Sequence, residues 1–374
     1  MQSEIRNMSI ECEKVGGINL SQGVCDTGVP EPVRRAAQQA IEDGLNSYTR
    51  HDGIAELRSA IARKMKGLYG VEVDPDREVV VTAGATGAFY CASLALLDPG
   101  DEIILFEPFD SYHASTLKAV DAVPVYVPMQ PPEWTFDPAA LERAVTPRTR
   151  GLMVSAPGNP TGKIFSPQEL DCLADFAERH DLFVFTDEIY EHFVYDGLRY
   201  TSPVTLPRLR SRTIAISGPS KTFSITGWRI GYAVADERWA RTIGYFSDLV
   251  YVCAPAPLQA GVARGLDCLP GEFYTQLSRE YGAKRDQICR SLEAAGLRPF
   301  WPKGAYYVMA DISAIPGSNS KERAMNLLEA TGVACVPGMA FYHDDGGERL
   351  ARFCFAKKDG DLDEACRRLE AHRW

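Results

Sequence analysis

Hydrophobic residues early in the chain recur every three or four positions, which is the spacing of a helix that buries one face. Residues 32–43 carry such a face, and so do residues 53–69. The recurring positions are Val33, Ala36, Ala37, Ala40 and Ile41 in the first segment and Ile54, Leu57, Ile61 and Met65 in the second. Residues 1–17 are polar, so we expect an arm there, followed by a short extended piece at residues 18–23.

From residue 78 onward, short uncharged runs alternate with amphipathic segments. The uncharged runs predict strands at residues 78–82, 102–106, 122–127, 151–155, 182–186, 213–217 and 230–235. The segments between them predict helices at residues 86–97, 110–119, 137–145 and 167–180. Uncharged strands that alternate with helices indicate a mainly parallel sheet covered on both faces. The predicted fold class is therefore α/β.

The pattern changes at about residue 269. A long charged helix is predicted at residues 273–295, and short strands at residues 297–301, 305–310, 334–336 and 350–355, with helices at 321–330 and 362–372. This mixture predicts a smaller α+β lobe. We divide the chain into an N-terminal arm and part of the small domain (1–40), a large ligand-binding domain (41–268) and a small C-terminal domain (269–374). We expect the small domain to close over a substrate.

Composition agrees with two domains and excludes some functions. The chain has 374 residues, of which 45% are hydrophobic, and its formal net charge is −10. A general nucleic-acid binder would need a basic face, so we expect no nucleic-acid partner. Residues 79–97 carry no charge, but their glycines, threonines and β-branched residues favour a strand, a turn and a buried helix over a membrane span.

The ten cysteines predict free thiols. They form no C-x-x-C pair and do not cluster with histidines, so we expect neither disulfides nor a metal site. The first ten residues contain no apolar segment of the kind found in secretory signals. These features lead us to expect a cytoplasmic protein.

Two small-residue segments follow predicted strands, where ligands of open α/β sheets bind. Residues 82–87 (TAGATG) open a helix, and Gly84, Ala85 and Thr86 could form a phosphate cup with their backbone N–H groups. An ordinary tight turn would explain the same residues. Residues 157–163 (PGNPTGK) resemble a Walker A loop, but the spacing is one residue short and an isoleucine follows the lysine, which excludes a P-loop. The segment therefore offers an exposed amide at Asn159.

Two further segments carry ionisable groups at predicted strand ends. Asp187 could face a protonated ring nitrogen, with Tyr190 one helical step away, although an aspartate there could equally cap a helix. Lys221 lies among small and aromatic residues, where partial desolvation would lower its pKa and keep the amine nucleophilic. Arg229 offers a planar donor fork for a phosphate. A phosphate cup, a carboxylate, a phenol, an amide and a lysine are together the groups that hold pyridoxal 5′-phosphate.

With these motifs in this order, the chain resembles fold-type I pyridoxal-phosphate enzymes of aminotransferase class I/II. It looks most like the branch of the kynurenine, glutamine–phenylpyruvate and bacterial aspartate/aromatic aminotransferases. The resemblance covers nearly the whole chain, from Ile18 to the last helix. It implies an enzyme that moves an amino group from an amino acid to a 2-oxo acid by a ping-pong mechanism.

The resemblance also implies a role for each residue. Lys221 would be the Schiff-base lysine and the proton shuttle, and Asp187 would keep the ring nitrogen protonated. The other cofactor-binding residues would be Asn159 and Tyr190 at the ring hydroxyl, Phe109 stacked on the ring, and Gly84, Ala85, Thr86, Ser217, Ser220 and Arg229 around the phosphate.

Three residues would complete the site. Arg352, in the sequence LARFCFAK, matches the arginine that holds the substrate carboxylate, together with Asn159. Gly23 matches a glycine near the bound substrate. Tyr48, in the sequence YTRHDGIAEL, matches a tyrosine that reaches the phosphate in the other subunit, so the resemblance implies a homodimer with shared sites.

Two positions depart from the family pattern. Gly218 stands where the family commonly has a phosphate-binding serine, so Ser217 or Ser220 would substitute. Residues 23–27 (GVCDT) lack the Phe-Pro-Asp run often found in the kynurenine/glutamine branch, so substrate preference does not transfer. Aromatic residues at positions 109, 112 and 306 favour a neutral or aromatic substrate side chain.

Two other functions use the same motifs. A lyase or biosynthetic synthase would also begin by removing the Cα proton, and the motifs do not separate it from an aminotransferase. A cofactor-binding transcription regulator is the non-enzymatic alternative, but the sequence contains no basic DNA-binding module.

Overall fold

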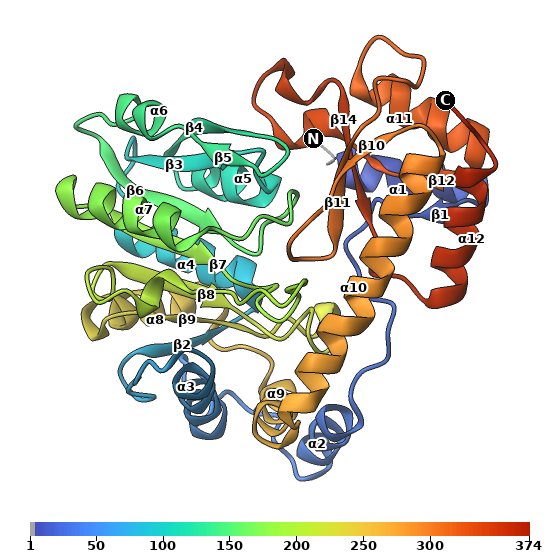
Figure 1. The fold of residues 1–374 in the computed structure, drawn as a ribbon. Coiled ribbons are helices and arrows are strands. Elements are labelled where there is room, and N and C mark those ends of the chain that lie inside the picture. Colours follow the sequence, from blue (N-terminus) through green and yellow to red (C-terminus); the bar gives the residue numbers. More distant parts are fainter. Residues whose placement is uncertain (1–3) are drawn as a thin grey trace.

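The computed structural model describes residues 4–374, and a large mixed sheet forms its centre (Figure 1). The strand order is β2-β9-β8-β7-β6-β3-β4-β5. Strands β8, β7, β6, β3 and β4 run parallel, whereas β9 is antiparallel to both of its neighbours. The strands are β2 Val79–Thr82, β3 Glu102–Glu107, β4 Val123–Gln130, β5 Thr135–Phe136, β6 Thr149–Ser155, β7 Phe183–Asp187, β8 Thr213–Ser217 and β9 Gly231–Val234. The predicted α/β class, with a mainly parallel sheet, is confirmed.

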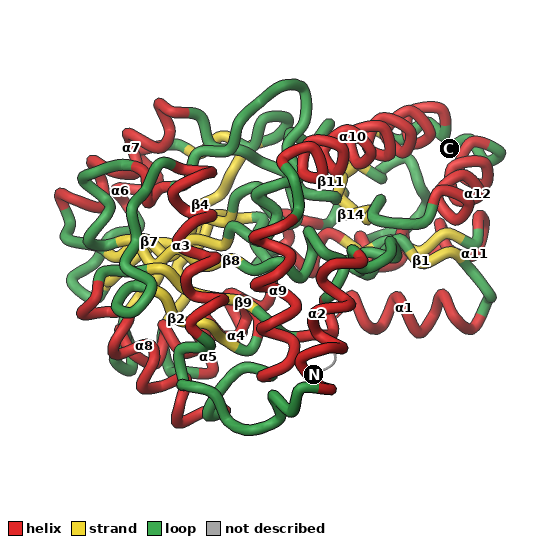
Figure 2. Tube along the Cα trace, turned by 90° about the horizontal axis from the view of Figure 1, so that it is seen from below, coloured by secondary structure: helices red, strands yellow, loops and turns green. Residues whose placement is uncertain are grey.

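Helices cover both faces of this sheet, because alternate residues of its strands point to opposite sides. On one face pack α4 Gly84–Leu96, α5 Ser111–Ala119 and α8 Glu237–Tyr251. On the other face pack α6 Pro138–Arg143 and α7 Pro167–Arg179 at one end, and α3 Ala55–Tyr69 and α9 Ala256–Cys268 at the other. Figure 2 shows α2 Glu31–Glu42 beside α9, and α9 packs against both α2 and α3.

A second, four-stranded antiparallel sheet has the order β10-β11-β14-β13. Its strands are β10 Arg298–Phe300, β11 Tyr307–Asp311, β13 Val336–Pro337 and β14 Leu350–Cys354. Around it lie α10 Gly271–Ala294, α11 Ser320–Thr331, α12 Asp359–Glu370 and the short helix η3 Gly338–Phe341. The long helix α10 runs from the neighbourhood of α9 to this sheet (Figure 1). The remaining short helices are η1 Pro203–Thr205, η2 Thr226–Trp228 and η4 Asp345–Gly347.

The N-terminal segment differs from the polar arm that the sequence predicts. It forms helix α1 Glu4–Lys14, which buries Met8 and Cys12 in the core of the smaller lobe. Strand β1 Ile18–Asn19 then pairs in parallel with β12 Val333–Ala334. Only two of the eleven residues of α1 are fully buried, so its sequence carries a weak helical pattern, and its place depends on the distant strands.

Three further features complete the description of the fold. Helices α8 and α9 fall in a stretch, residues 236–268, for which the sequence pattern predicted no element. All ten cysteines are free, as predicted. Within residues 4–374, none of the helices has the length and apolar character that a membrane span requires.

Candidate active site

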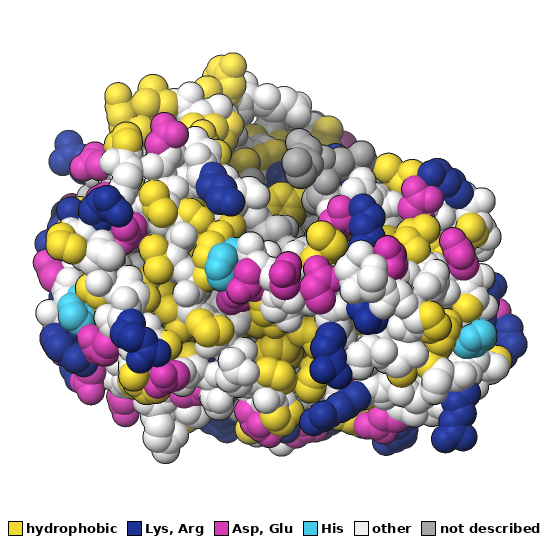
Figure 3. Space-filling view, turned by 90° about the horizontal axis from the view of Figure 1, so that it is seen from above, with side chains coloured by type: hydrophobic (Ala, Val, Ile, Leu, Met, Phe, Trp, Pro, Cys, Tyr) yellow, Lys and Arg dark blue, Asp and Glu magenta, His cyan; other side chains and the backbone are white. Residues whose placement is uncertain are grey.

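A cavity of about 540 Å³ lies between the two sheets. Its walls come from the carboxyl ends of parallel strands, from the N-terminal ends of α4 and α5, from α1 and residues 22–24, and from β11 and β14. The space-filling view shows the molecule hollowed between its two parts, with acidic and basic side chains interspersed over this face (Figure 3). The cavity therefore draws on segments from both ends of the chain.

An anion-binding corner forms where α4 begins. Gly84 adopts a left-handed φ of +78°, and a Cβ on it would lie 2.2 Å from Nη2 of Arg229. A Cβ on Gly231 would lie 2.3 Å from the backbone nitrogen of Ala85. Only glycine allows this approach, which brings the guanidinium of Arg229 to the N-terminus of a helix. Ala85, Thr86 and Arg229 all line the cavity, and together they fit a phosphate group.

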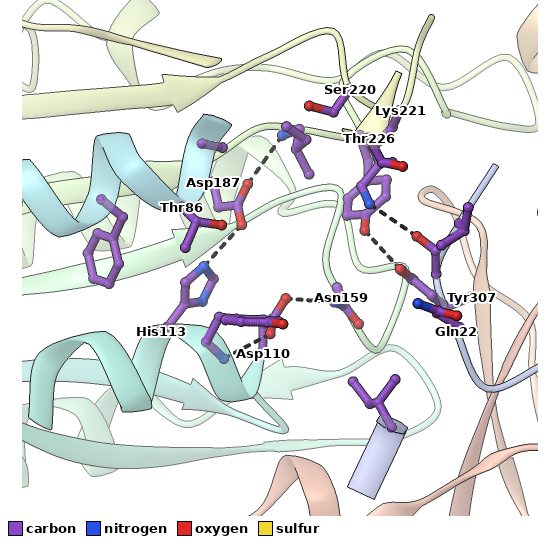
Figure 4. A pocket seen from close by; sticks show the side chains of 18 of the residues that line it. Gln22, Thr86, Asp110, His113, Asn159, Asp187, Ser220, Lys221, Thr226 and Tyr307 are labelled. Atoms are coloured by element: carbon purple, nitrogen blue, oxygen red, sulfur yellow. Dashed lines mark hydrogen bonds and ion pairs between the residues drawn. The ribbon is translucent and has the colours of Figure 1, made fainter. Parts of the chain in front are cut away.

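A carboxylate–imidazole pair lies at the end of β7. Oδ2 of Asp187 is 3.0 Å from Nε2 of His113 on α5 (Figure 4). Burial lowers the pKa of His113, but the hydrogen bond and the charge of Asp187 outweigh it, so the pKa lies above its ordinary value. The edge of Phe89 packs against the imidazole ring, with centroids 5.5 Å apart. Asp187 is thus held in one orientation, with its carboxylate in the cavity.

The amine of Lys221 lies in an aromatic enclosure. Nζ donates a hydrogen bond to the carbonyl of Gly23, 3.1 Å away, and lies 5.9 Å from the ring centroids of Tyr190 and Tyr306. Burial lowers the pKa of Lys221, which favours the neutral, nucleophilic amine. The hydroxyl of Tyr190 is 2.9 Å from that of Tyr307.

Gly23 closes the same end of the cavity, because a Cβ there would lie 1.8 Å from the hydroxyl oxygen of Tyr307. The close approach of Tyr307 therefore leaves no room for a side chain at this position.

Arg352 on β14 is only 1% exposed. Nη1 donates to Oδ1 of Asn159 at 2.8 Å, and Nη2 donates to the carbonyl of Ser21 at 2.7 Å. The guanidinium lies between the rings of Tyr307 and Phe341, 4.2 and 4.9 Å from their centroids. Within the described part of the chain, its buried Nε has no hydrogen-bond partner. A fixed, enclosed guanidinium with a free N–H fits a carboxylate ligand.

Most of the residues singled out in the sequence line this one cavity. They are Gly23, Ala85, Thr86, Asn159, Asp187, Tyr190, Ser220, Lys221, Arg229 and Arg352. Four others lie elsewhere. Gly84 is not part of the lining, although the next two residues, Ala85 and Thr86, are. Ser217 donates to Glu191 at 2.9 Å, and the ring of Phe109 stacks on Tyr126. Tyr48 is 83% exposed and lies outside the cavity lining.

The cavity lining also includes residues for which no site role was predicted from the sequence, among them Asp110, His113, Thr226 and Tyr307. His113 lies on the buried side of α5, six positions after the end of β3, so position alone gives no signal of its partner. Glu107, His343 and Asp344 have metal-ligand spacing but do not line the cavity. Glu107 and His343 already pair with each other at 2.9 Å.

The α/β fold has two lobes, and an anion cup, a strand-end carboxylate and an enclosed lysine lie between them. These features define a group-transfer enzyme of the kind that works through a phosphorylated cofactor. Over residues 15–369 the chain matches the family described as aminotransferase class I and II, and it belongs to that family. The chain is therefore an aminotransferase, and the resemblance noted in the sequence is confirmed.

Individual relatives agree with this assignment. The probable N-succinyldiaminopimelate aminotransferase DapC of Mycobacterium tuberculosis is 37% identical over 97% of this chain and 94% of its own. Its solved structure matches with a TM-score of 0.95, covering 99% of this chain and 97% of that one. Kynurenine–oxoglutarate transaminase 3 of Rattus norvegicus is 32% identical over 96% of this chain and 87% of its own. The methionine aminotransferase YbdL of Escherichia coli matches with a TM-score of 0.95 at 32% identity, covering 99% and 97% of the two chains. These names support transamination over the lyase alternative.

Proposed function

We propose that the cavity binds pyridoxal 5′-phosphate and that the enzyme uses it to transaminate an amino acid and a 2-oxo acid. One observation carries the proposal: the amine of Lys221, the carboxylate of Asp187 and the N-terminus of α4 line the same cavity. These are the three contacts that an aldehyde, a pyridine nitrogen and a phosphate need.

Each group of site residues would bind a different part of the cofactor. The backbone of Ala85 and Thr86 would hold the phosphate together with Arg229 and Ser220. Asn159 and Tyr190 would contact the ring hydroxyl, and Asp187, held by His113, would keep the ring nitrogen protonated. Phe109, whose ring stacks on Tyr126, would supply the aromatic face for the cofactor ring.

When bound, pyridoxal 5′-phosphate supplies an aldehyde that takes up the amino group and a ring that withdraws electrons from Cα of the substrate. Lys221 then acts as general base and general acid, because its lowered pKa lets it accept the Cα proton and return it. The aromatic rings around Lys221 exclude water from this proton transfer.

The substrate carboxylate would bind Arg352. Its buried guanidinium is already oriented by Asn159 and Ser21, so binding requires little further ordering. Ile5, Ile10, Tyr112 and Tyr307 also line the cavity, and this apolar and aromatic lining favours a neutral or aromatic substrate side chain.

We also propose a homodimer in which Tyr48 reaches the phosphate in the partner's cavity. Tyr48 is 83% exposed and lines no part of the cavity in its own chain. The end of α8 and the residues after it expose Tyr245, Leu249, Val250 and Val252, and exposed apolar residues of this kind mark protein interfaces. The division at residues 40 and 268, with a small domain that closes over substrate, and a cytoplasmic location belong to the same proposal.

An absorbance spectrum of the purified protein tests the proposed cofactor. We expect a visible band that moves to shorter wavelength when amino acids are added and returns when a 2-oxo acid is added. A band that persists while ammonia or pyruvate accumulates would instead indicate elimination. A protein that acquires no band even with added pyridoxal 5′-phosphate would contradict the proposal.

Lys221→Ala should abolish both the band and turnover, since no other amine in the described lining takes its place. Lys118→Ala, on the exposed side of α5, is the matched control and should retain both. Turnover near the wild-type level in Lys221→Ala would contradict the role of this lysine.

A further inference from the structure

Asp110 presents a carboxylate to the cavity from the loop between β3 and α5 (Figure 4). Both of its oxygens accept hydrogen bonds. Oδ1 accepts from the backbone N–H of Tyr112 at 3.0 Å and caps α5, and Oδ2 accepts from Nδ2 of Asn159 at 2.7 Å. The first bond holds the side chain to the helix, and the second reaches across the cavity wall to the loop after β6.

The second bond determines how the amide of Asn159 is oriented. An amide has a donor end and an acceptor end. Asp110 takes the donor end, so the acceptor end, Oδ1, faces Nη1 of Arg352 at 2.8 Å. The three side chains therefore form one hydrogen-bonded chain from α5 to β14, and its last member is the guanidinium that would hold the substrate carboxylate.

The loop that carries Asp110 is also attached to the smaller lobe directly. The backbone N–H of Phe109 donates to the carbonyl of Phe341 at 3.0 Å, and the ring of Phe341 lies 4.9 Å from the guanidinium of Arg352. Two residues earlier, at the end of β3, Glu107 accepts from the backbone N–H of His343 at 2.6 Å. Asp110 and Arg352 are thus connected by two separate sets of hydrogen bonds in this structure.

We propose that Asp110 is a positioning residue for carboxylate recognition, because it orients the amide of Asn159 toward Arg352. The proposal rests on the proposed function, in which Arg352 holds the substrate carboxylate. It assigns to Asp110 a task beyond capping α5 and beyond contributing negative charge to the cavity. Each of these three roles predicts a different result for one substitution.

That substitution is Asp110→Asn. Asparagine caps helices about as well as aspartate, so a capping role predicts no change. Removal of a negative charge from the cavity would by itself tighten the binding of a carboxylate. The positioning role predicts weaker binding of a carboxylate. Asparagine has one side-chain oxygen for the two donors that Asp110 accepts, so when this oxygen caps α5, the NH₂ group faces Asn159. The amide of Asn159 then turns its own NH₂ group toward Arg352, and the guanidinium loses its acceptor.

The experiment is calorimetric titration of the cofactor-loaded enzyme with 3-phenylpropanoate, a carboxylate without an amino group. We expect Asp110→Asn to raise the dissociation constant roughly tenfold while the melting temperature and the cofactor band stay at wild-type values. In an Asn159→Ala background the same substitution should no longer weaken binding, because the residue through which Asp110 acts is absent.

Asp137→Asn provides the matched control. Asp137 caps α6 in the same way, through Ala139 at 2.9 Å, on the surface and away from the cavity, so its substitution should leave the dissociation constant unchanged. Unchanged or tighter binding in Asp110→Asn would overturn the proposal, and so would an equal loss of affinity with and without Asn159. Arg352→Ala tests the proposed function on which this inference rests, the binding of the substrate carboxylate by Arg352. If that variant binds 3-phenylpropanoate as well as the wild type, the proposed carboxylate site itself is overturned.

Discussion

At the scale of single residues, the site depends on ionisable groups whose charged forms burial alone would disfavour. Burial lowers the pKa of Lys221, and the burial of His113 would lower its pKa too if Asp187 did not hold the proton. Burial therefore outweighs the neighbouring groups at Lys221, whereas the pairing with Asp187 outweighs burial at His113. An amine with a lowered pKa and a fixed carboxylate–imidazole pair suit a reaction that moves a proton next to a protonated ring nitrogen.

The pairing of His113 with Asp187 can be tested by removing the charge. In Asp187→Asn the imidazole loses its paired carboxylate and keeps burial and the attraction of Asp110, so we expect the pKa of His113 to fall and turnover to fall with it. NMR titration of the histidine ring signals measures this pKa. His180 serves as the internal control, because it pairs with Glu142 on the surface and not with Asp187. An unchanged His113 titration would contradict the pairing.

A second buried carboxyl predicts a pH-dependent stability. Burial and the neighbouring Glu191 raise the pKa of Glu188 to about 7, although Ser202 and Thr186 donate hydrogen bonds to it. A carboxyl with a raised folded-state pKa stabilises the fold below its unfolded pKa, and this contribution is lost as pH rises through about 7. We therefore expect Glu188→Gln to melt at a higher temperature than the wild type at pH 8 but not at pH 5.

Differential scanning calorimetry across this pH range measures the difference. Glu280→Gln, on the exposed side of α10, is the control and should show no difference that depends on pH. A constant difference between Glu188→Gln and the wild type from pH 5 to pH 8 would contradict the raised pKa.

At the scale of elements, helix starts and strand ends place the functional groups. Lys221 follows β8, Asp187 ends β7, Asn159 follows β6 and Asp110 precedes α5. The parallel strands β6, β7 and β8 bring their carboxyl ends to one edge of the sheet, which is why residues up to 62 positions apart share a wall. The start of α4 supplies the anion cup at the same edge.

Gly84→Ala tests this element. The added Cβ would lie 2.2 Å from Nη2 of Arg229 and would impose a side chain on a φ of +78°. We expect the affinity for pyridoxal 5′-phosphate to fall at least tenfold and the stability to fall by about 1 kcal/mol. Equilibrium dialysis and urea unfolding measure the two effects.

Gly87→Ala is the matched control for this prediction, since it lies one turn further along α4. Its Cβ would meet no atom closer than 3.5 Å, so cofactor affinity should be retained and stability should be equal or higher. Equal cofactor affinity in Gly84→Ala and the wild type would contradict the proposed cup.

At the scale of the whole molecule, the site is completed by segments that are far apart in the chain. Gly23 lies near the N-terminus and Arg352 near the C-terminus, and both meet the large sheet at the cavity. The proposed dimer extends this principle to a second chain, because Tyr48 lies outside the cavity of its own subunit.

A subunit-mixing experiment tests the shared site. Tyr48→Ala and Lys221→Ala homodimers should each have little activity. After the subunits exchange, about half of the dimers are hybrids, and each hybrid has one intact site, so about a quarter of wild-type activity should return. Sedimentation analysis verifies that dimers form. Hybrids that form without recovering activity would contradict the contribution of Tyr48 across the interface.

Short-range patterns were enough to predict much of this protein. Uncharged strands alternating with amphipathic helices predicted the α/β sheet, because burial on both faces of a parallel sheet leaves few polar positions in its strands. Lys221, Asp187 and Asn159 could be singled out because each follows a predicted strand, and such positions converge at one edge of a parallel sheet. These inferences need only a few neighbouring residues.

Tertiary structure alone decided which way side chains point and which distant segments meet. Phe109 follows a strand as predicted, yet its ring stacks on Tyr126, while the next residue, Asp110, faces the cavity. The polar N-terminal segment became helix α1 because strands more than three hundred residues away receive Met8 and Cys12. His113 meets Asp187 across 74 positions. Such contacts depend on packing between elements. A local sequence pattern does not identify a partner that only the folded chain brings near.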